Sequence, residues 1–128
     1  MKRGVDLFNA GEYWSAHEAW EEEWMPDRRG PEAGFYKGLI QVAAGCLHYT
    51  RRNRRGALNK WRSGADYLRP YVPEHGGVDL APLVTRVDEM RSRLETSAGW
   101  PELDLPRIGY RPGSEGAGGA PGSRSKRR

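Results

Sequence analysis

Apolar residues recur at three- and four-residue spacing through most of the first 97 residues, which is the period of an α-helix. The pattern is interrupted by short segments rich in glycine, proline and charged residues, where helices usually end. No alternating pattern typical of a β-strand competes with it. We therefore expect an all-α fold, a compact bundle of about five helices over residues 2–9, 12–24, 31–52, 55–71 and 80–97.

The third predicted helix is apolar around most of its circumference, which is typical of a helix at the centre of a bundle. Pro31 suits its first turn, because that position needs no backbone N–H. One narrow stripe of this helix carries small and polar residues instead of large apolar ones. Small residues there would let another helix come close, with Gln41 and His48 facing it. The stripe consists of Gly34, Gly38, Gln41, Ala44, Gly45 and His48.

The chain after the fifth helix divides into two segments. Residues 99–110 contain Pro101 and Pro106 and are expected to form an extended strap, held to the bundle by Trp100, Leu103, Leu105 and Ile108. From Arg111 onward glycine, proline, serine and arginine dominate, a composition typical of disorder. The predicted organisation is one helical domain over residues 1–110 and a disordered tail over residues 111–128.

The charge of the chain has the same division. The whole sequence has 21 Lys and Arg against 17 Asp and Glu. The predicted tail holds five of the basic residues and one acid, so residues 1–110 have a net charge of zero. The basic balance therefore belongs to the tail and is weak support for a nucleic-acid-binding domain.

The cysteine content and the hydropathy indicate the cellular setting. Cys46 is the single cysteine, so an internal disulfide is excluded, and its apolar neighbours favour a buried, inert thiol. Neither a signal peptide nor a membrane-spanning segment is apparent, and a cytoplasmic protein is expected. The tryptophans Trp14, Trp20, Trp24 and Trp61 are expected to pack in the core or at its edge.

The second predicted helix carries the residues best suited to chemistry. His17 and Glu21 are four apart, so their side chains leave the same face one turn apart. His17 lies on the apolar face between Tyr13 and Trp20, while Glu18 lies further round. A histidine beside a carboxylate can hold a metal ion or form a structural pair. The zinc-protease pattern HExxH is not met, because Glu21 stands where the second histidine belongs.

Gln41 and His48 extend this cluster if the second and third helices pack along the small-residue stripe. Two imidazoles and a carboxylate, from His17, His48 and Glu21, suffice for a divalent metal such as zinc with an open position. Glu18 would then be the candidate base. The alternative is a purely structural network, in which Gln41 and His48 hydrogen-bond Glu21 and fix the packing. Both interpretations remain open at the level of the sequence.

Two further features have less specific meanings. Arg51, Arg52, Arg54 and Arg55 cluster at a helix end, where the helix dipole favours positive charge. The same cluster, with the basic tail, is a candidate contact for a nucleic-acid backbone. His75 stands in a glycine-flanked loop without an evident partner.

The combined motifs resemble the domain-of-unknown-function 309 family of small bacterial and archaeal proteins. The resemblance is carried by Phe8-Asn9-Ala10-Gly11-Glu12-Tyr13-Trp14, His17-Glu18-Ala19-Trp20-Glu21, Trp24, the segment from Phe35 to Ala44, and His48-Tyr49. It spans about residues 5–70 and implies a compact helical bundle. It implies no activity, but its signature centres on the positions of His17, Glu18, Glu21, Gln41 and His48.

Three functional hypotheses follow. The first is a non-catalytic helical module whose His/Glu/Gln cluster joins the helices and whose surface binds a partner or a second copy of the chain. The second is a small metal-dependent enzyme, hydrolase-like, using His17, Glu21 and His48. The third is weak nucleic-acid binding through residues 51–55 and the tail.

Overall fold

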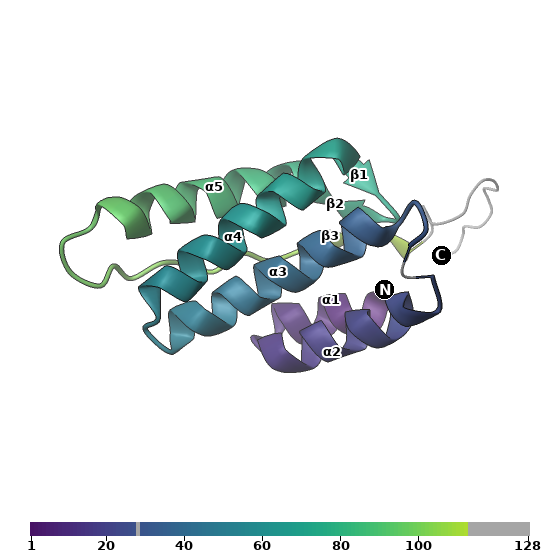
Figure 1. Ribbon diagram of the computed structural model, residues 1–128, viewed down its shortest axis with the longest axis horizontal. Helices are drawn as coiled ribbons and strands as arrows, with labels where there is room; N and C mark the ends of the chain where they lie inside the picture. Colours follow the sequence, from purple (N-terminus) through teal and green to yellow (C-terminus); the bar gives the residue numbers. More distant parts are fainter. Residues whose placement is uncertain (28, 113–128) are drawn as a thin grey trace.

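The computed structural model describes residues 1–27 and 29–112, and within these ranges five α-helices form a bundle (Figure 1). The all-α prediction is confirmed. Two short 3₁₀ turns, η1 (Met25–Asp27) and η2 (Arg69–Tyr71), continue the second and fourth helices. The helices are α1 (Lys2–Asn9), α2 (Tyr13–Trp24), α3 (Ala33–Thr50), α4 (Arg54–Leu68) and α5 (Leu80–Thr96).

The helix ends follow local chemistry. Gly11 adopts a φ of +82° just after α1, a conformation that glycine takes without steric cost. Asn53 caps α4, and its Oδ1 accepts a hydrogen bond from the Gly56 backbone N at 2.9 Å. The prediction for Pro31 was wrong, because α3 begins at Ala33 after the N-cap Glu32.

Three two-residue strands lie at one end of the bundle: β1 (Glu74–His75), β2 (Val78–Asp79) and β3 (Gly109–Tyr110). They form an antiparallel sheet in the order β1-β2-β3. Gly76 and Gly77 both have positive φ, as a two-residue hairpin turn requires. These strands leave no β pattern in the sequence, because two residues are too few to show an alternation.

The third helix is central, as expected, with α2 on one side and α4 on the other (Figure 1). Its large apolar residues, including Phe35, Leu39, Val42 and Cys46, are buried. The stripe of small residues is divided between the two neighbours. A Cβ on Gly38 would lie 2.5 Å from Leu68 Cγ, and one on Gly45 would lie 2.3 Å from Trp61 Cδ1.

Gly38 and Gly45 thus face α4, while Ala44 lines a pocket beside α2. His48 lies between that pocket and the start of α4. The small-residue stripe therefore contacts two neighbouring helices, α2 and α4. Successive residues of a helix are rotated by about 100°, so neighbours such as Ala44 and Gly45 meet different partners.

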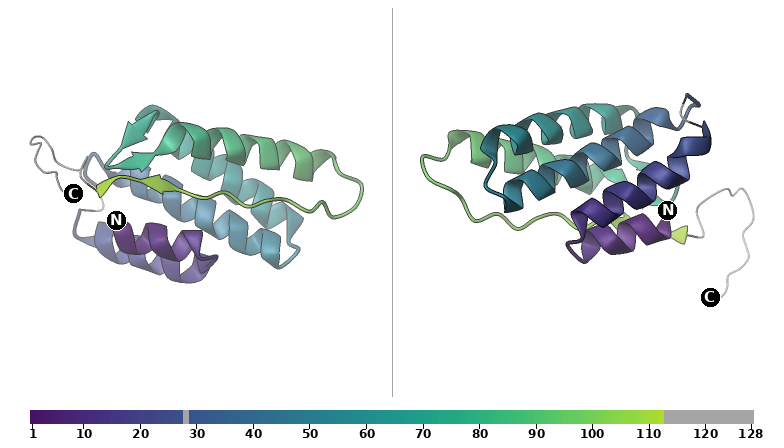
Figure 2. Two further views of the ribbon diagram at one scale, coloured as in Figure 1. Left: turned by 180° about the vertical axis from the view of Figure 1, so that it is seen from behind. Right: turned by 60° about the horizontal axis from the view of Figure 1, so that its bottom comes forward.

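The predicted strap is present. It crosses the face of α3 and α4 that is turned away from the viewer in Figure 1 and that the left view of Figure 2 shows from the front. Tyr49 holds it at one point: its hydroxyl donates to the Pro101 carbonyl O at 2.6 Å and accepts from the Leu103 N at 2.8 Å. At the other end the Asn9 side chain pairs with both backbone polar groups of Ile108, at 3.0 and 2.7 Å.

Most of the predicted tail, residues 113–128, lies outside the described residues. Among the helices of the described ranges, none has the length and apolar character needed to cross a bilayer.

Candidate functional site

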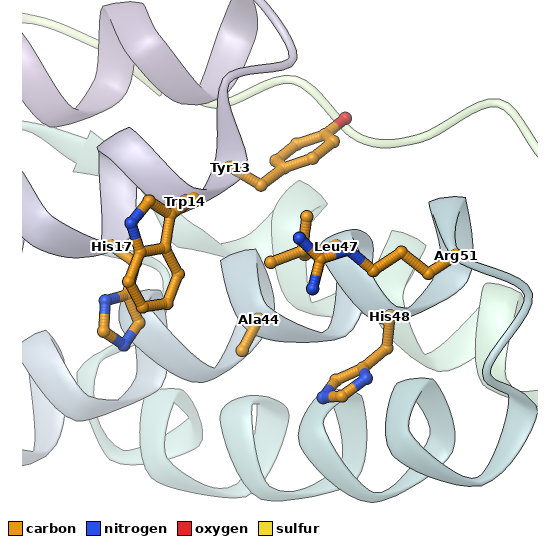
Figure 3. Close-up of a pocket in the computed structure, with 7 residues that line it drawn as sticks. All are labelled: Tyr13, Trp14, His17, Ala44, Leu47, His48 and Arg51. Atoms are coloured by element: carbon orange, nitrogen blue, oxygen red, sulfur yellow. The ribbon is translucent and has the colours of Figure 1, made fainter.

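A pocket of about 210 Å³ opens between α2 and α3, and we call it the α2–α3 pocket (Figure 3). The two helices run antiparallel, so the first turns of α2 lie beside the last turns of α3. Each helix contributes residues at three- and four-residue spacing, because such residues share a face. The lining residues are Tyr13, Trp14, His17, Ala44, Leu47, His48 and Arg51.

Trp14 and His17 form one wall of this pocket. Their rings are stacked, with centroids 5.0 Å apart and an angle of 9° between the planes. Trp14 is 56% exposed and so lies outside the core, whereas Trp20 and Trp61 are buried within it. The Nδ1 atom of His17 is buried and finds no hydrogen-bond partner among the described residues. An unpaired buried polar atom costs stability, so the Nδ1 of His17 adds no hydrogen bond that would hold the fold.

His48 forms the opposite part of the lining, and its role in the fold is clear. Asn53 Oδ1 accepts from a backbone N–H, so its Nδ2 must be the donor in the 3.0 Å contact with His48 Nδ1. The imidazole proton therefore lies on Nε2. A Cβ on Gly56 would come within 2.6 Å of His48 Nδ1, so the ring also packs on the start of α4.

Arg51 supplies the positive charge of the pocket. Figure 3 shows its guanidinium turned back over Leu47 toward the other lining residues. Among the described residues it forms no ion pair or hydrogen bond through its side chain.

The remaining arginines of the predicted cluster have different surroundings. Arg54 donates to the carbonyls of Leu94, Ser97 and Gly99 at the end of α5. Both Arg52 and Arg54 lie over the Trp100 ring, 5.7 and 5.5 Å from its centroid. Arg54 therefore stabilises the end of α5, and the cluster is not one continuous cationic surface.

The structure brings only part of the predicted site together. His17, His48 and Tyr13 line the pocket, whereas Glu21, Gln41 and the exposed Glu18 do not. Trp20 is buried beneath α1, where a Cβ on Gly4 would lie 2.2 Å from its Nε1.

Spacing along the helices accounts for this separation. Gln41 and His48 are seven residues apart on α3, which is roughly 10 Å along the axis. Within the described ranges, no three His, Cys, Asp or Glu side chains are arranged to hold a metal ion. Metal binding by His17, Glu21 and His48 stays a prediction that this geometry does not support.

Burial keeps two ionisable groups neutral, Tyr13 in the pocket lining and Cys46 in the core. It raises the pKa of Tyr13 to about 12, with a smaller contribution from Cys46, and it raises the pKa of Cys46 to about 12. A thiol with so high a pKa has almost no thiolate near neutral pH. Cys46 is therefore the inert core residue that the sequence indicated.

His75 forms an ionisable pair that local spacing in the sequence did not reveal. His75 Nε2 lies 2.7 Å from Glu32 Oε1, and the His75 ring packs against Phe35 and Tyr71 at 4.7 and 4.8 Å between centroids. His75 thus has a partner that was not evident from the sequence. The two residues are 43 positions apart, and only the β1–β2 hairpin brings them together.

A family model described as "Domain of unknown function (DUF309)" matches residues 1–59, which confirms the resemblance seen in the sequence. The matched segment contains α1, α2 and α3, and with them every residue that lines the α2–α3 pocket. No curated protein matches the sequence.

Proposed function

We propose that this member of the DUF309 family is a non-catalytic binding module whose ligand occupies the α2–α3 pocket. The observation that carries the proposal is the wall formed by Trp14 and His17. A large aromatic side chain stands 56% exposed there, stacked on a histidine whose buried Nδ1 has no partner among the described residues. Exposed aromatic surface beside unsatisfied polar groups is typical of binding sites.

The surroundings of the two histidines support binding over acid–base chemistry. A general base needs an orienting partner and a group within hydrogen-bond reach. Asn53 orients His48, but it does so through Nδ1, so the remaining Nε2 already carries the proton and cannot accept another. His17 has no carboxylate beside it among the pocket residues. Glu18, the predicted base, does not line the pocket.

The proposal is tested by recording ¹H–¹⁵N NMR spectra of the full chain with a set of small-molecule fragments. We expect fragments that bind to change the chemical shifts of the backbone amides mainly in residues 13–17 and 44–51. The proposal is contradicted if none of the fragments changes the signals of this region, whether or not other residues respond.

A Zn²⁺ titration of the same sample tests the metal-dependent alternative. Saturation at one equivalent, centred on His17 and His48 and abolished in His17→Ala, would favour the enzyme over the binding module. We expect Zn²⁺ to bind without this stoichiometry or this location.

A further inference from the structure

We infer that the α2–α3 pocket takes a small aromatic carboxylate, with its ring against Trp14 and its carboxylate on Arg51. This inference rests on the proposed function and adds the chemical class of the ligand. It follows from the charge, the size and the shape of the pocket.

The charge of the lining is entirely positive or neutral. Arg51 is the one permanent charge among the seven lining residues, and neither an aspartate nor a glutamate is among them. His48 presents Nε2–H as its remaining donor, because Nδ1 accepts from Asn53. A guanidinium binds a carboxylate through two parallel hydrogen bonds, which gives both affinity and orientation.

The helix ends at the pocket have opposing effects on an anion. The end of α3 carries partial negative charge, whereas the start of α2 carries partial positive charge. The N-cap Glu12 makes no side-chain hydrogen bond to the first turn of α2, so its N–H groups are not capped in this way. Because the two dipoles roughly offset one another, the full charge of Arg51 decides the sign of the ligand.

The size of the pocket restricts the ligand to about one ring. An apolar cavity of about 150 Å³ holds a benzene molecule. The α2–α3 pocket, at about 210 Å³, has room for a ring and one small substituent. A nucleotide is too large to be enclosed.

The shape of the pocket favours a flat ligand. Trp14 presents an exposed, flat indole, and Tyr13, Ala44 and Leu47 provide apolar or aromatic surface around it. Aromatic rings pack on such surfaces by offset stacking or edge contacts. A second, wider hollow of about 360 Å³ is lined by Ser63, Asp66 and Tyr67, where a carboxylate ligand would meet a like charge. This second hollow is an internal control, because an aromatic carboxylate is expected to bind in the α2–α3 pocket and not there.

The test uses benzoate as the probe on the full chain, followed by ¹H–¹⁵N NMR titration. Benzamide has nearly the same shape without the charge, and acetate has the charge without the ring. We expect benzoate to shift residues 13–17 and 44–51 and to leave Tyr67 unchanged. We expect benzamide and acetate to bind at least about tenfold more weakly.

Two variants assign the contacts. Arg51→Gln is expected to lower benzoate affinity about tenfold, to the level of benzamide, and Trp14→Ala is expected to lower it by a similar factor. Both side chains are exposed, so the fold is retained, which the spectra themselves report. Arg55→Gln, an exposed arginine outside the pocket, is the matched control and should leave the affinity unchanged.

Equal binding of benzoate and benzamide, or benzoate binding that survives Arg51→Gln, would overturn the carboxylate assignment. If other fragments shift the pocket while benzoate does not, the ligand class is wrong and the proposed function stands. If no compound shifts the pocket, both fail.

Discussion

Gly64→Ala is expected to lower the free energy of unfolding by about 3 kcal/mol, although alanine is the better helix former. A Cβ at this position would lie 2.8 Å from Val42 Cγ2 and 3.0 Å from both the Gly38 carbonyl O and the Val42 backbone N. Backbone atoms cannot rotate away as a side chain can, so α3 and α4 would have to separate. The gain in helix propensity, about 1 kcal/mol, is smaller than this cost.

Urea denaturation followed by circular dichroism measures the effect, with Gly99→Ala as the control. A Cβ on Gly99 meets nothing within 4 Å, so this variant is expected to stay within about 0.5 kcal/mol of the parent. A Gly64→Ala protein as stable as the parent would show that α3 and α4 do not pack at this distance.

Tyr49→Phe is expected to lower the free energy of unfolding by about 2 to 3 kcal/mol. The hydroxyl bridges two backbone groups of the strap, and both hydrogen bonds are buried. Removing it leaves the Leu103 N–H and the Pro101 carbonyl without this partner, and each unsatisfied buried group costs about 1 kcal/mol or more. The ring contacts with Trp61 and Trp100 are retained by phenylalanine.

Tyr71→Phe is the matched control, because the Tyr71 hydroxyl donates to the Pro31 carbonyl at an exposed position. We expect it to cost about 0.5 kcal/mol or less. Hydrogen exchange adds a local readout, since the Leu103 amide should lose protection in Tyr49→Phe and keep it in Tyr71→Phe. Equal effects of the two substitutions would contradict the assigned role of Tyr49 in holding the strap.

The helices and the central place of α3 could be predicted because they depend on one-dimensional periodicity. The run from Phe35 to Tyr49 has apolar residues on nearly every side, and such a helix must be covered on every side. The strap was predictable for a related reason, since Leu103 and Ile108 alternate with polar residues and prolines. The three short strands were not, because they depend on the β1–β2 hairpin and on the pairing of Val78 with Tyr110, which lie far apart in the sequence.

The sequence predicted where the candidate site lies but not which residues line it. Spacing placed His17 and His48 on facing surfaces, and both line the α2–α3 pocket. Spacing alone did not give the rotation of α3, which turns Gly45 toward α4 and Ala44 toward α2. Nor did it reveal that Trp14 is exposed, because a tryptophan beside an apolar face is usually buried.

Arg51 and Arg54 also show that spacing in the sequence does not reveal the surroundings of each side chain. They are three residues apart in an arginine-rich segment, yet Arg54 binds carbonyls at the end of α5 and Arg51 turns to the pocket. The difference arises because α3 ends at Thr50 and α4 begins at Arg54, so the chain reverses between them. Arg52, with a φ of +57°, lies within this reversal.

The central claim is that His17 belongs to a surface made for binding and does not hold the bundle together. The free energy of unfolding of His17→Leu, measured beside His48→Leu, tests it most directly. Leucine removes the unpaired Nδ1 of His17 and favours the helix, so we expect stability equal to that of the parent or higher by about 1 kcal/mol. His48→Leu breaks the contact with Asn53 and should lose about 1 kcal/mol. A loss of more than about 1 kcal/mol in His17→Leu would contradict the account and place His17 in a structural network.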